Sequence, residues 1–312
     1  MPKKIIVCEC AARDGLQHEA EFIPTERKVA MIDRFTALGF RRIEATSFSH
    51  PKHVPQFADA EEVLARIDRR DGVSYKATCV NARAVERAVA SGEAGAGPNE
   101  ISMVISASET HQLRNTRRNH AEIRDEFKAM AEIVGDSGMR VVGTIGTAFG
   151  CPFTGEVPFE AVARWVDFFG TLGIDFITLG DTVGMGNPHM VRERFAALMS
   201  EFPRMTWIGH FHDTRGLGVA NALAAAEVGV DHLDSSFGGL GGHPAGIKYA
   251  HGHTGNVVTE DLVSALVDMG FDTGLDLSRL VETAEFVENV VGRELHGRVA
   301  RAGLTSQRLG SD

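Results

Sequence analysis

The feature that most constrains the fold of this sequence is a regular alternation of short β-branched apolar runs with longer amphipathic stretches. The short runs start 25 to 41 residues apart, which is the spacing of repeated strand–helix units rather than of hairpins. They cover residues 5–8, 42–45, 74–78, 100–104, 141–144, 176–179, 207–211 and 232–235. Eight strands, each followed by a helix, predict an α/β fold of the (β/α)8 or TIM-barrel class.

The stretches between the strands have the pattern of helices. Apolar side chains recur at helical spacing over residues 25–38, 120–137 and 158–172. Several of these stretches end in a glycine, which adopts the left-handed conformation of a helix C-terminus without a Cβ penalty. An open, doubly wound sheet is the alternative. It is disfavoured because no GxGxxG motif follows the first strand.

The domain organisation predicted from the sequence is simple. No linker, low-complexity segment or block of charge divides the chain, so we predict one catalytic barrel domain over residues 1–296 and a short C-terminal extension over 297–312. Residues 238–255 have the glycine content of a linker. They follow the eighth strand, however, where a barrel carries an active-site loop.

Composition excludes several classes of protein. The chain has 32 Lys and Arg against 42 Asp and Glu, and this net charge of −10 leaves no basic stripe for a nucleic acid. Its four cysteines are too few and too scattered for a secreted disulfide scaffold. No run approaches the 18 apolar residues of a membrane span, and the first residues, MPKKIIVCEC, lack the apolar core of a signal peptide. We therefore expect a cytoplasmic protein that binds neither nucleic acid nor membrane.

Polar and ionisable residues gather where the predicted strands end. In a barrel these positions share the face that carries the active site. They are Arg13, Asp14, residues 44–47, Asn81, Ser106, Thr144, Asp181, His210, His212 and Ser235.

The most specific local pattern is the pair His210 and His212 on the seventh strand. Residues i and i+2 of a strand point to the same side, so the two imidazoles lie together. Such a pair suits a divalent metal ion, with a carboxylate such as Asp14 on the neighbouring first strand completing the site. Two histidines without a ligand are the alternative. The mixed oxygen and nitrogen donors favour Mg²⁺ or Mn²⁺ over a structural zinc ion. Cys8 and Cys10 lack a second pair and are interpreted as small core residues.

A longer set of motifs resembles one known family. Residues 8–19 read CECAARDGLQHE and residues 44–52 read EATSFSHPK. Further motifs are SASE at 106–109 with Asn115, FGCPF at 149–153, LGDTVG at 179–184, HFHDT at 210–214, DSS at 234–236, GLGG at 239–242 and GNVVTEDL at 255–262. Together they resemble the 3-hydroxy-3-methylglutaryl-CoA lyases, a branch of a metal-dependent barrel superfamily. The resemblance covers about residues 5 to 295.

The resemblance implies roles for particular residues. Asp14, His210, His212 and Asn256 would hold one Mg²⁺ or Mn²⁺ ion. Arg13 would stabilise the enolate that forms when a 3-hydroxyacyl-CoA is cleaved to acetyl-CoA and a keto product, and retro-aldol chemistry of this kind needs such a cation together with a base and a Lewis acid. Glu44 would orient Arg13. We assign further catalytic roles to His210, His243 and Asp181, and substrate binding to Gln17, Ser47, Asn115 and Thr178.

His243 marks a departure from the family pattern. In the family a cysteine follows the GLGG motif, whereas this chain has histidine there, and the loop before Asn256 is about four residues longer. His243 can replace the thiol as the acid/base, because its ordinary pKa near 6.5 suits proton transfer at neutral pH. Alternatively, the change marks a different substrate, and the two interpretations are compatible. A loop histidine without a chemical role is the third possibility.

Two other functions remain open at this point. The same metal ion, Arg13 and Glu44 would serve an aldolase or a condensing enzyme acting on a different hydroxy or keto acid. A catalytically silent barrel is disfavoured because the set of metal ligands is intact. The resemblance also permits a homodimer.

Overall fold

The computed structural model describes residues 2–242 and 254–305. Its centre is a closed parallel barrel in which the strands pair in sequence order and β8 pairs with β1. The strands are β1 (Ile6–Glu9), β2 (Arg42–Ser47), β3 (Ser74–Thr78), β4 (Glu100–Ser106), β5 (Arg140–Gly146), β6 (Phe176–Asp181), β7 (Thr206–Phe211) and β8 (His232–Ser235). This confirms the predicted (β/α)8 class.

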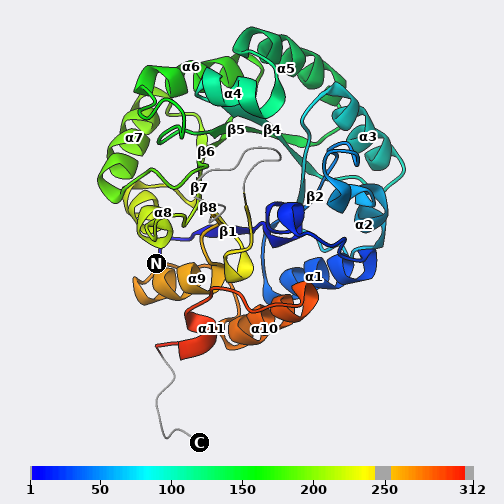
Figure 1. Cartoon of the computed structure of the whole chain (residues 1–312), viewed down its shortest axis with the longest axis vertical. Coiled ribbons are helices and arrows are strands. Elements are labelled where there is room, and N and C mark those ends of the chain that lie inside the picture. Colours follow the sequence, from blue (N-terminus) through cyan, green and yellow to red (C-terminus); the bar gives the residue numbers. More distant parts are fainter. Residues whose placement is uncertain (1, 243–253, 306–312) are drawn as a thin grey trace, which may run out of the picture.

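The helices form a ring around the barrel, as Figure 1 shows in a view along the barrel axis. The ring contains α1 (Thr25–Leu38), α2 (Ala60–Arg66), α3 (Ala82–Glu93), α4 (Glu109–Thr116), α5 (His120–Val134), α6 (Phe159–Thr171), α7 (Pro188–Glu201), α8 (Gly218–Val228) and α9 (Thr259–Asp268). Their buried faces carry large apolar side chains such as Phe35, Phe127, Trp165 and Phe195. The main core therefore lies between the helices and the outer surface of the barrel.

Several strands continue beyond the ends predicted from the sequence. β2 ends at Ser47, β4 at Ser106, β5 at Gly146 and β6 at Asp181. Polar residues and glycine interrupt the apolar pattern there, although the backbone ladder continues through them. Three of these strand ends, at Ser47, Ser106 and Asp181, place polar side chains at the C-terminal end of the barrel.

The interior of the barrel is unusually polar. Branched apolar side chains normally fill such an interior. Here Arg42 and Glu100 form a buried ion pair at 2.5 Å, and Lys76 and Asp234 are also buried. Buried charges need partners, because removing a charge from water is costly. The polar interior therefore indicates a functional site rather than a packing core.

The C-terminal part of the described chain, up to residue 305, packs against the barrel. Helix α10 (Leu280–Val291) contacts α1, and the short α11 (Val299–Ala302) contacts α9 and α10. The backbone amides of Arg298 and Val299 donate to the Asp261 carboxylate at 3.2 and 2.7 Å. These contacts join the start of the extension to the barrel, so the structure does not mark a domain boundary at residue 297. That boundary remains a prediction.

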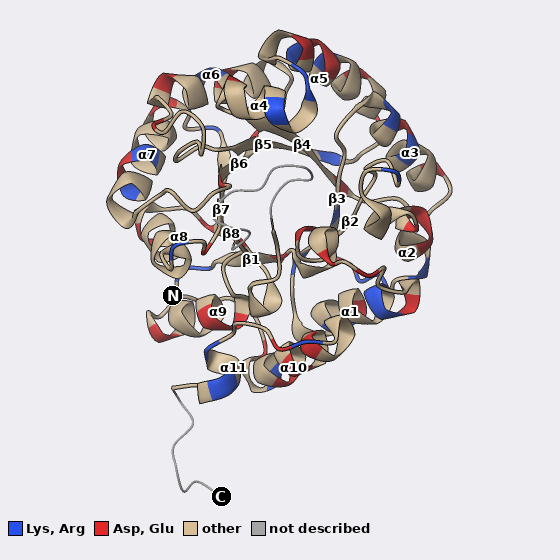
Figure 2. Ribbon diagram, in the orientation of Figure 1, with Lys and Arg blue, Asp and Glu red and all other residues tan. Residues whose placement is uncertain are grey.

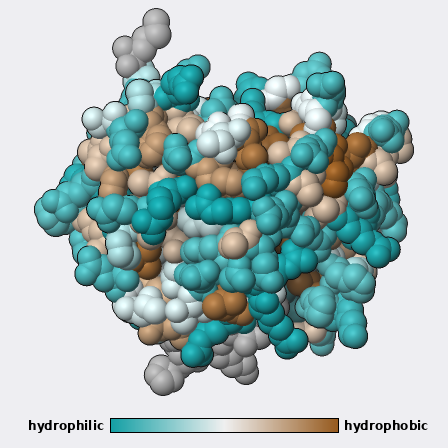
Figure 3. Space-filling model, turned by 90° about the horizontal axis from the view of Figure 1, so that it is seen from above, coloured by the Kyte–Doolittle hydropathy of each residue, from teal (hydrophilic) through white to brown (hydrophobic). Residues whose placement is uncertain are grey.

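The outer surface mixes charges and apolar groups. Figure 2 shows acidic and basic residues interspersed along the outer helices, and in the face seen in Figure 3 apolar residues are scattered among hydrophilic ones. Within the described residues, no helix is both long and apolar enough to span a membrane.

Candidate functional site

A pocket of about 710 Å³ opens at the end of the barrel where the strands finish. Its walls come from the turn after β1, from strands β3 to β8 and from α4. Arg13, Asp14, His210 and His212 all line it. The structure thus brings together the central residues of the predicted site.

The turn after β1 positions Arg13 and Asp14. Residues Ala11–Gly15 form a short π-helix. Arg13 Nη1 donates to Asp14 Oδ1 at 2.7 Å, and Arg13 Nε lies 2.7 Å from Glu44 Oε1. The guanidinium is therefore held between two carboxylates, and Glu44 orients it from the neighbouring strand β2.

The two histidines of β7 meet Asp14 in the same pocket. His210 Nε2 lies 3.2 Å from His212 Nε2, and one ligand atom from each of Asp14, His210 and His212 lies within 4.8 Å of the others. His212 Nδ1 lies 3.0 Å from Thr254 Oγ1, which fixes the orientation of its ring. This is the arrangement that two histidines and a carboxylate need in order to share one metal ion.

Asn256 joins the cluster from the loop after β8. Its amide nitrogen donates to Asp14 Oδ2 at 2.6 Å and to the Leu240 carbonyl at 3.0 Å. Gly241 has a φ of +151°, and a Cβ there would lie 2.6 Å from Asn256 Nδ2, so glycine is required for this close approach. In the described part of the chain, Asn256 Oδ1 is buried without a hydrogen-bond partner. An unpaired amide oxygen beside a carboxylate suits a cation.

The electrostatic environment keeps Asp14 and His212 in the protonation states that metal binding needs. Burial alone would raise the pKa of Asp14, but Arg13 and the two histidines hold it well below its usual range. Burial and the neighbouring His210 lower the pKa of His212 to about 3. The cluster therefore offers an ionised carboxylate and a neutral imidazole, the forms that coordinate metal ions.

Asp234 supports the cluster, although sequence reasoning gave it no role. Its Oδ2 lies 3.3 Å from His210 Nδ1 and 3.9 Å from Lys76 Nζ. Burial would lower the pKa of His210, but the hydrogen bond that its Nδ1 donates to Asp234 raises it. A carboxylate on the second ring nitrogen is the usual support of a metal-binding histidine. The DSS motif at 234–236 was the sequence signal that could have indicated this role of Asp234.

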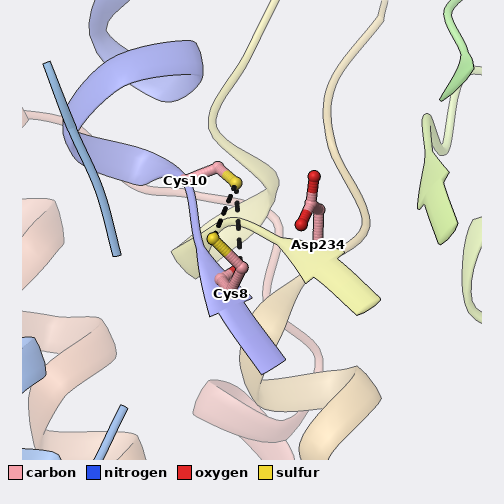
Figure 4. Close-up of side chains that lie close together, drawn as sticks. All are labelled: Cys8, Cys10 and Asp234. Carbon is pink, nitrogen blue, oxygen red and sulfur yellow. Dashed lines mark hydrogen bonds between the residues drawn. The ribbon is translucent and has the colours of Figure 1, made fainter. Parts of the chain in front are cut away.

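Cys8, Cys10 and Asp234 form a second group of possible metal ligands, which differs in its chemistry from the cluster of Asp14, His210 and His212. Figure 4 shows the two sulfur atoms side by side on the β1 side of Asp234, and they are 4.0 Å apart. The contact with Cys8 and burial both raise the pKa of Cys10, so this thiol stays protonated. A protonated thiol is a poor metal ligand. This fits the interpretation of both cysteines as small core residues.

Glu44 and Asn256 reach the site through Arg13 and Asp14 without lining the pocket themselves. Three further predicted site residues, Asp181, Ser47 and Thr178, do not line it either. Asp181 is buried, and its carboxylate accepts the backbone amides of Met185 and Gly186 at 2.8 and 3.0 Å; burial raises its pKa to about 6. Ser47 lies 2.8 Å from Ser49 Oγ and donates to the Thr78 carbonyl. Thr178 is buried inside the barrel, and its hydroxyl has no partner among the described residues. The roles assigned to these three remain predictions.

Gln17 and Asn115 do line the pocket. The same wall carries Arg114, Arg117 and Arg118, which place several cations beside the opening. Arg114 also packs over the Phe153 ring, at 4.3 Å from its centroid. His243 lies outside the described residues, so its position relative to the pocket remains a prediction.

Glu9 connects the two loops that form the site. Its Oε1 accepts the backbone amides of Ala11 and Phe237, at 2.9 and 3.1 Å, and its Oε2 accepts the Thr259 hydroxyl at 2.6 Å. Burial raises its pKa to about 8. Glu9 thus ties the turn that bears Arg13 to the loop after β8.

We expect Glu9→Gln to change how stability depends on pH. A carboxyl with a raised pKa contributes stability that is present below its unfolded value near 4.5 and is lost as pH rises through about 8. Glutamine does not ionise: its Oε1 can still accept the two backbone amides, and its amide nitrogen can donate to the Thr259 hydroxyl in place of the contact at Oε2. The variant should therefore gain about 1 kcal/mol or more over the parent between pH 5 and pH 9, measured by denaturant unfolding. The exposed Glu201→Gln is the control, and a pH-independent difference would contradict this role.

Comparison with known proteins places the chain in a family. The model of the family described as HMGL-like matches residues 4–287. The chain belongs to the HMGL-like family. Among curated relatives of this family, hydroxymethylglutaryl-CoA lyase YngG of Bacillus subtilis is 38% identical over 95% of this chain and 96% of its own length. The mitochondrial hydroxymethylglutaryl-CoA lyase of Homo sapiens is 36% identical over 97% and 90%.

Solved structures agree with this membership. An HMG-CoA lyase from Acinetobacter baumannii, in complex with coenzyme A and 3-methylmalate, superposes with a TM-score of 0.90 at 38% identity, covering 98% of this chain and 97% of that one. The carboxyl transferase domain of Rhizobium etli pyruvate carboxylase has a TM-score of 0.70 at 18% identity, covering 93% of this chain and 47% of that one. The second likeness shows the fold alone. The resemblance to the lyase branch seen in the sequence is confirmed.

Proposed function

We propose that this protein is a divalent-cation-dependent carbon–carbon lyase. It cleaves a 3-hydroxyacyl-CoA similar to 3-hydroxy-3-methylglutaryl-CoA into acetyl-CoA and an oxo product. One observation carries the proposal: the guanidinium of Arg13, whose side chain is 14% exposed, lies 2.7 Å from Asp14, which also belongs to a cluster suited to a metal ion. Enolate-forming cleavage needs these two elements in one pocket. The names of the curated relatives support the same activity.

The donor set fits a hard divalent cation. Asp14, His210, His212 and the unpaired Oδ1 of Asn256 offer oxygen and imidazole ligands without a thiolate. We infer that these four residues hold one Mg²⁺ or Mn²⁺ ion. A cation bound there would act as a Lewis acid on the substrate oxygens and lower the pKa of the 3-hydroxyl.

Arg13 stabilises the charge that forms during cleavage. When the bond between C2 and C3 breaks, its electron pair moves to C2 and the thioester becomes an enolate. The guanidinium has fixed N–H donors, and Glu44 holds it in place at 2.7 Å. Because the side chain is mostly shielded from solvent and already oriented, it meets the developing negative charge without reorganisation.

The hydroxyl proton has to leave as C3 becomes a carbonyl carbon. His210 is the assigned acceptor, since it lines the pocket beside Asp14. Its Nδ1 donates to Asp234, so Nε2 would take the proton, at a stage when that nitrogen is not a metal ligand. The enolate then takes a proton at C2, which releases acetyl-CoA. We assign this second transfer to His243. All atoms balance without an oxidant or reductant.

The rest of the pocket suits an acyl-CoA. Arg114, Arg117 and Arg118 on the wall supply cations for the phosphates of coenzyme A, and Gln17 and Asn115 supply neutral hydrogen-bonding groups. The related lyase solved with coenzyme A and 3-methylmalate supports this class of ligand. We also propose a cytoplasmic location, where acyl-CoA substrates are available.

A panel of substrates tests the reaction type. The protein is incubated with Mg²⁺ and either 3-hydroxyacyl-CoA thioesters or 4-hydroxy-2-oxo acids, and acetyl-CoA and oxo products are quantified by chromatography. We expect acetyl-CoA from a 3-hydroxy-3-methylglutaryl-like thioester. Cleavage of a 4-hydroxy-2-oxo acid without cleavage of any thioester would instead identify an aldolase.

A further inference from the structure

Lys76 is a charged residue inside the barrel that the mechanism above does not use. It lies on β3, lines the pocket, and has a side chain that is only 3% exposed. Lysine is among the residues least often buried, because its ammonium group loses its hydration. A buried lysine on the wall of a substrate pocket therefore needs a functional explanation.

The contacts of Lys76 leave its hydrogen-bonding capacity unused. Its Nζ lies 3.7 Å from Glu44 Oε1 and 3.9 Å from Asp234 Oδ2, and both distances are longer than a hydrogen bond. The structure shows no hydrogen bond from Nζ to any residue in 2–242 or 254–305. Its three N–H donors therefore face the pocket without a direct acceptor among these described residues.

Glu44 and Asp234 keep the Lys76 ammonium charged, although each carboxylate has a closer partner than Lys76. Burial would lower the pKa of Lys76, but Glu44 and Asp234 raise it overall, so the amine is not a nucleophile. Glu44 already pairs with Arg13 and accepts the Thr78 hydroxyl at 2.7 Å. Asp234 is bonded to His210. The ammonium is therefore available to a ligand.

The pocket around Lys76 is polar. Thr78, Ser102 and Thr144, from β3, β4 and β5, line the same pocket, and Ser102 Oγ lies 2.7 Å from Thr144 Oγ1. The three hydroxyls already have partners, but a purely aliphatic acyl chain would leave the ammonium group without an acceptor. The ammonium group does suit an oxygen-bearing anionic group.

We propose that Lys76 selects the acyl group of the substrate by binding a carboxylate at the end of the acyl chain opposite the thioester. The inference rests on the proposed function, in which Arg13 takes the thioester end. Glu44 Oε1 lies 2.7 Å from Arg13 Nε and 3.7 Å from Lys76 Nζ, so the two cations flank one carboxylate. A short acyl chain can therefore reach both. The bound carboxylate stays on the oxo product when the bond between C2 and C3 breaks.

Matched thioesters test the role of Lys76. We compare 3-hydroxy-3-methylglutaryl-CoA with 3-hydroxy-3-methylpentanoyl-CoA, in which a methyl group replaces the carboxylate. We expect the parent protein to prefer the first by about 10²-fold in kcat/KM, and Lys76→Met to reduce this ratio to about 5-fold or less. Lys76→Gln provides a second variant of similar size should the methionine variant fold poorly. A ratio that is unchanged in the variants would overturn the proposal, since a residue that only positions Glu44 and Asp234 lowers both rates alike.

Affinity measurements with uncleavable thioesters test the role of Lys76 independently of the proposed reaction. The analogues 3-methylglutaryl-CoA and 3-methylpentanoyl-CoA lack the 3-hydroxyl and cannot be cleaved by this route. By calorimetry with Mg²⁺ present, the parent should bind the first about 10-fold or more tightly than the second. Loss of this preference in Lys76→Met supports the proposal even if no thioester is cleaved, an outcome that would count against the lyase function alone. Equal affinities in the parent protein would overturn the role of Lys76.

Discussion

Arg13→Met is expected to lower kcat by about 10³-fold or more while leaving the fold intact. The guanidinium is held at 2.7 Å by both Asp14 and Glu44, so it is fixed in place before the substrate binds. A preorganised cation at the position of a developing enolate acts mainly in the transition state. The loss should therefore appear in kcat rather than in KM, measured by initial rates of acetyl-CoA release.

Two further variants distinguish a catalytic role of Arg13 from a role in substrate binding. Arg13→Lys keeps the charge but loses the planar fork, so we expect it to recover only part of the rate. Arg117→Met removes a cation from the opening of the same pocket, and we expect it to raise KM more than it lowers kcat, because it would contact coenzyme A away from the reacting bond. If Arg13→Met raised KM with kcat unchanged, Arg13 would be a binding residue rather than a catalytic one.

His212→Ala is expected to weaken the binding of Mn²⁺ by about 10²-fold or more and to remove activity at ordinary metal concentrations. His212 is one of three proposed ligands whose donor atoms lie within 4.8 Å of one another, and its lowered pKa of about 3 keeps the imidazole neutral. Losing one ligand leaves an incomplete site. Calorimetry with Mn²⁺ measures this loss directly and does not depend on the choice of substrate.

A histidine elsewhere in the chain provides the matched control. His189 lies on α7 with a side chain that is 78% exposed, where it pairs with Glu193. His189→Ala should bind Mn²⁺ as the parent does. Equal Mn²⁺ affinity in the His212 variant and the parent would show that the metal is held elsewhere or that the cluster holds none.

The fold was predictable because its main signal is local. The strand starts and the helix at Thr25–Leu38 follow from the periodicity of apolar residues, and repeated spacing then indicates the closed barrel. Strand ends were less predictable. Residues such as Ser106 and Gly146 interrupt the apolar pattern, yet they pair with each other in the ladder between β4 and β5.

The candidate site was only partly predictable for a related reason. Asp14, His210 and His212 follow from the rule that the ends of barrel strands share one face, and the structure brings them together. That rule gives positions but not side-chain directions. Asp181 also ends a strand, yet it bonds to its own loop. Lys76 lies within β3 rather than at its end, so only the three-dimensional structure shows that it reaches the pocket.

The most direct test of the central claim follows both products of one reaction. Protein freed of metal by a chelator is incubated with 3-hydroxy-3-methylglutaryl-CoA, and acetyl-CoA and the 3-oxo acid are quantified before and after Mn²⁺ is added in excess. We predict neither product before the addition and equal amounts of both afterwards. Cleavage that persists in excess chelator, or an absence of acetyl-CoA with Mn²⁺ bound to the protein, would contradict a metal-dependent lyase.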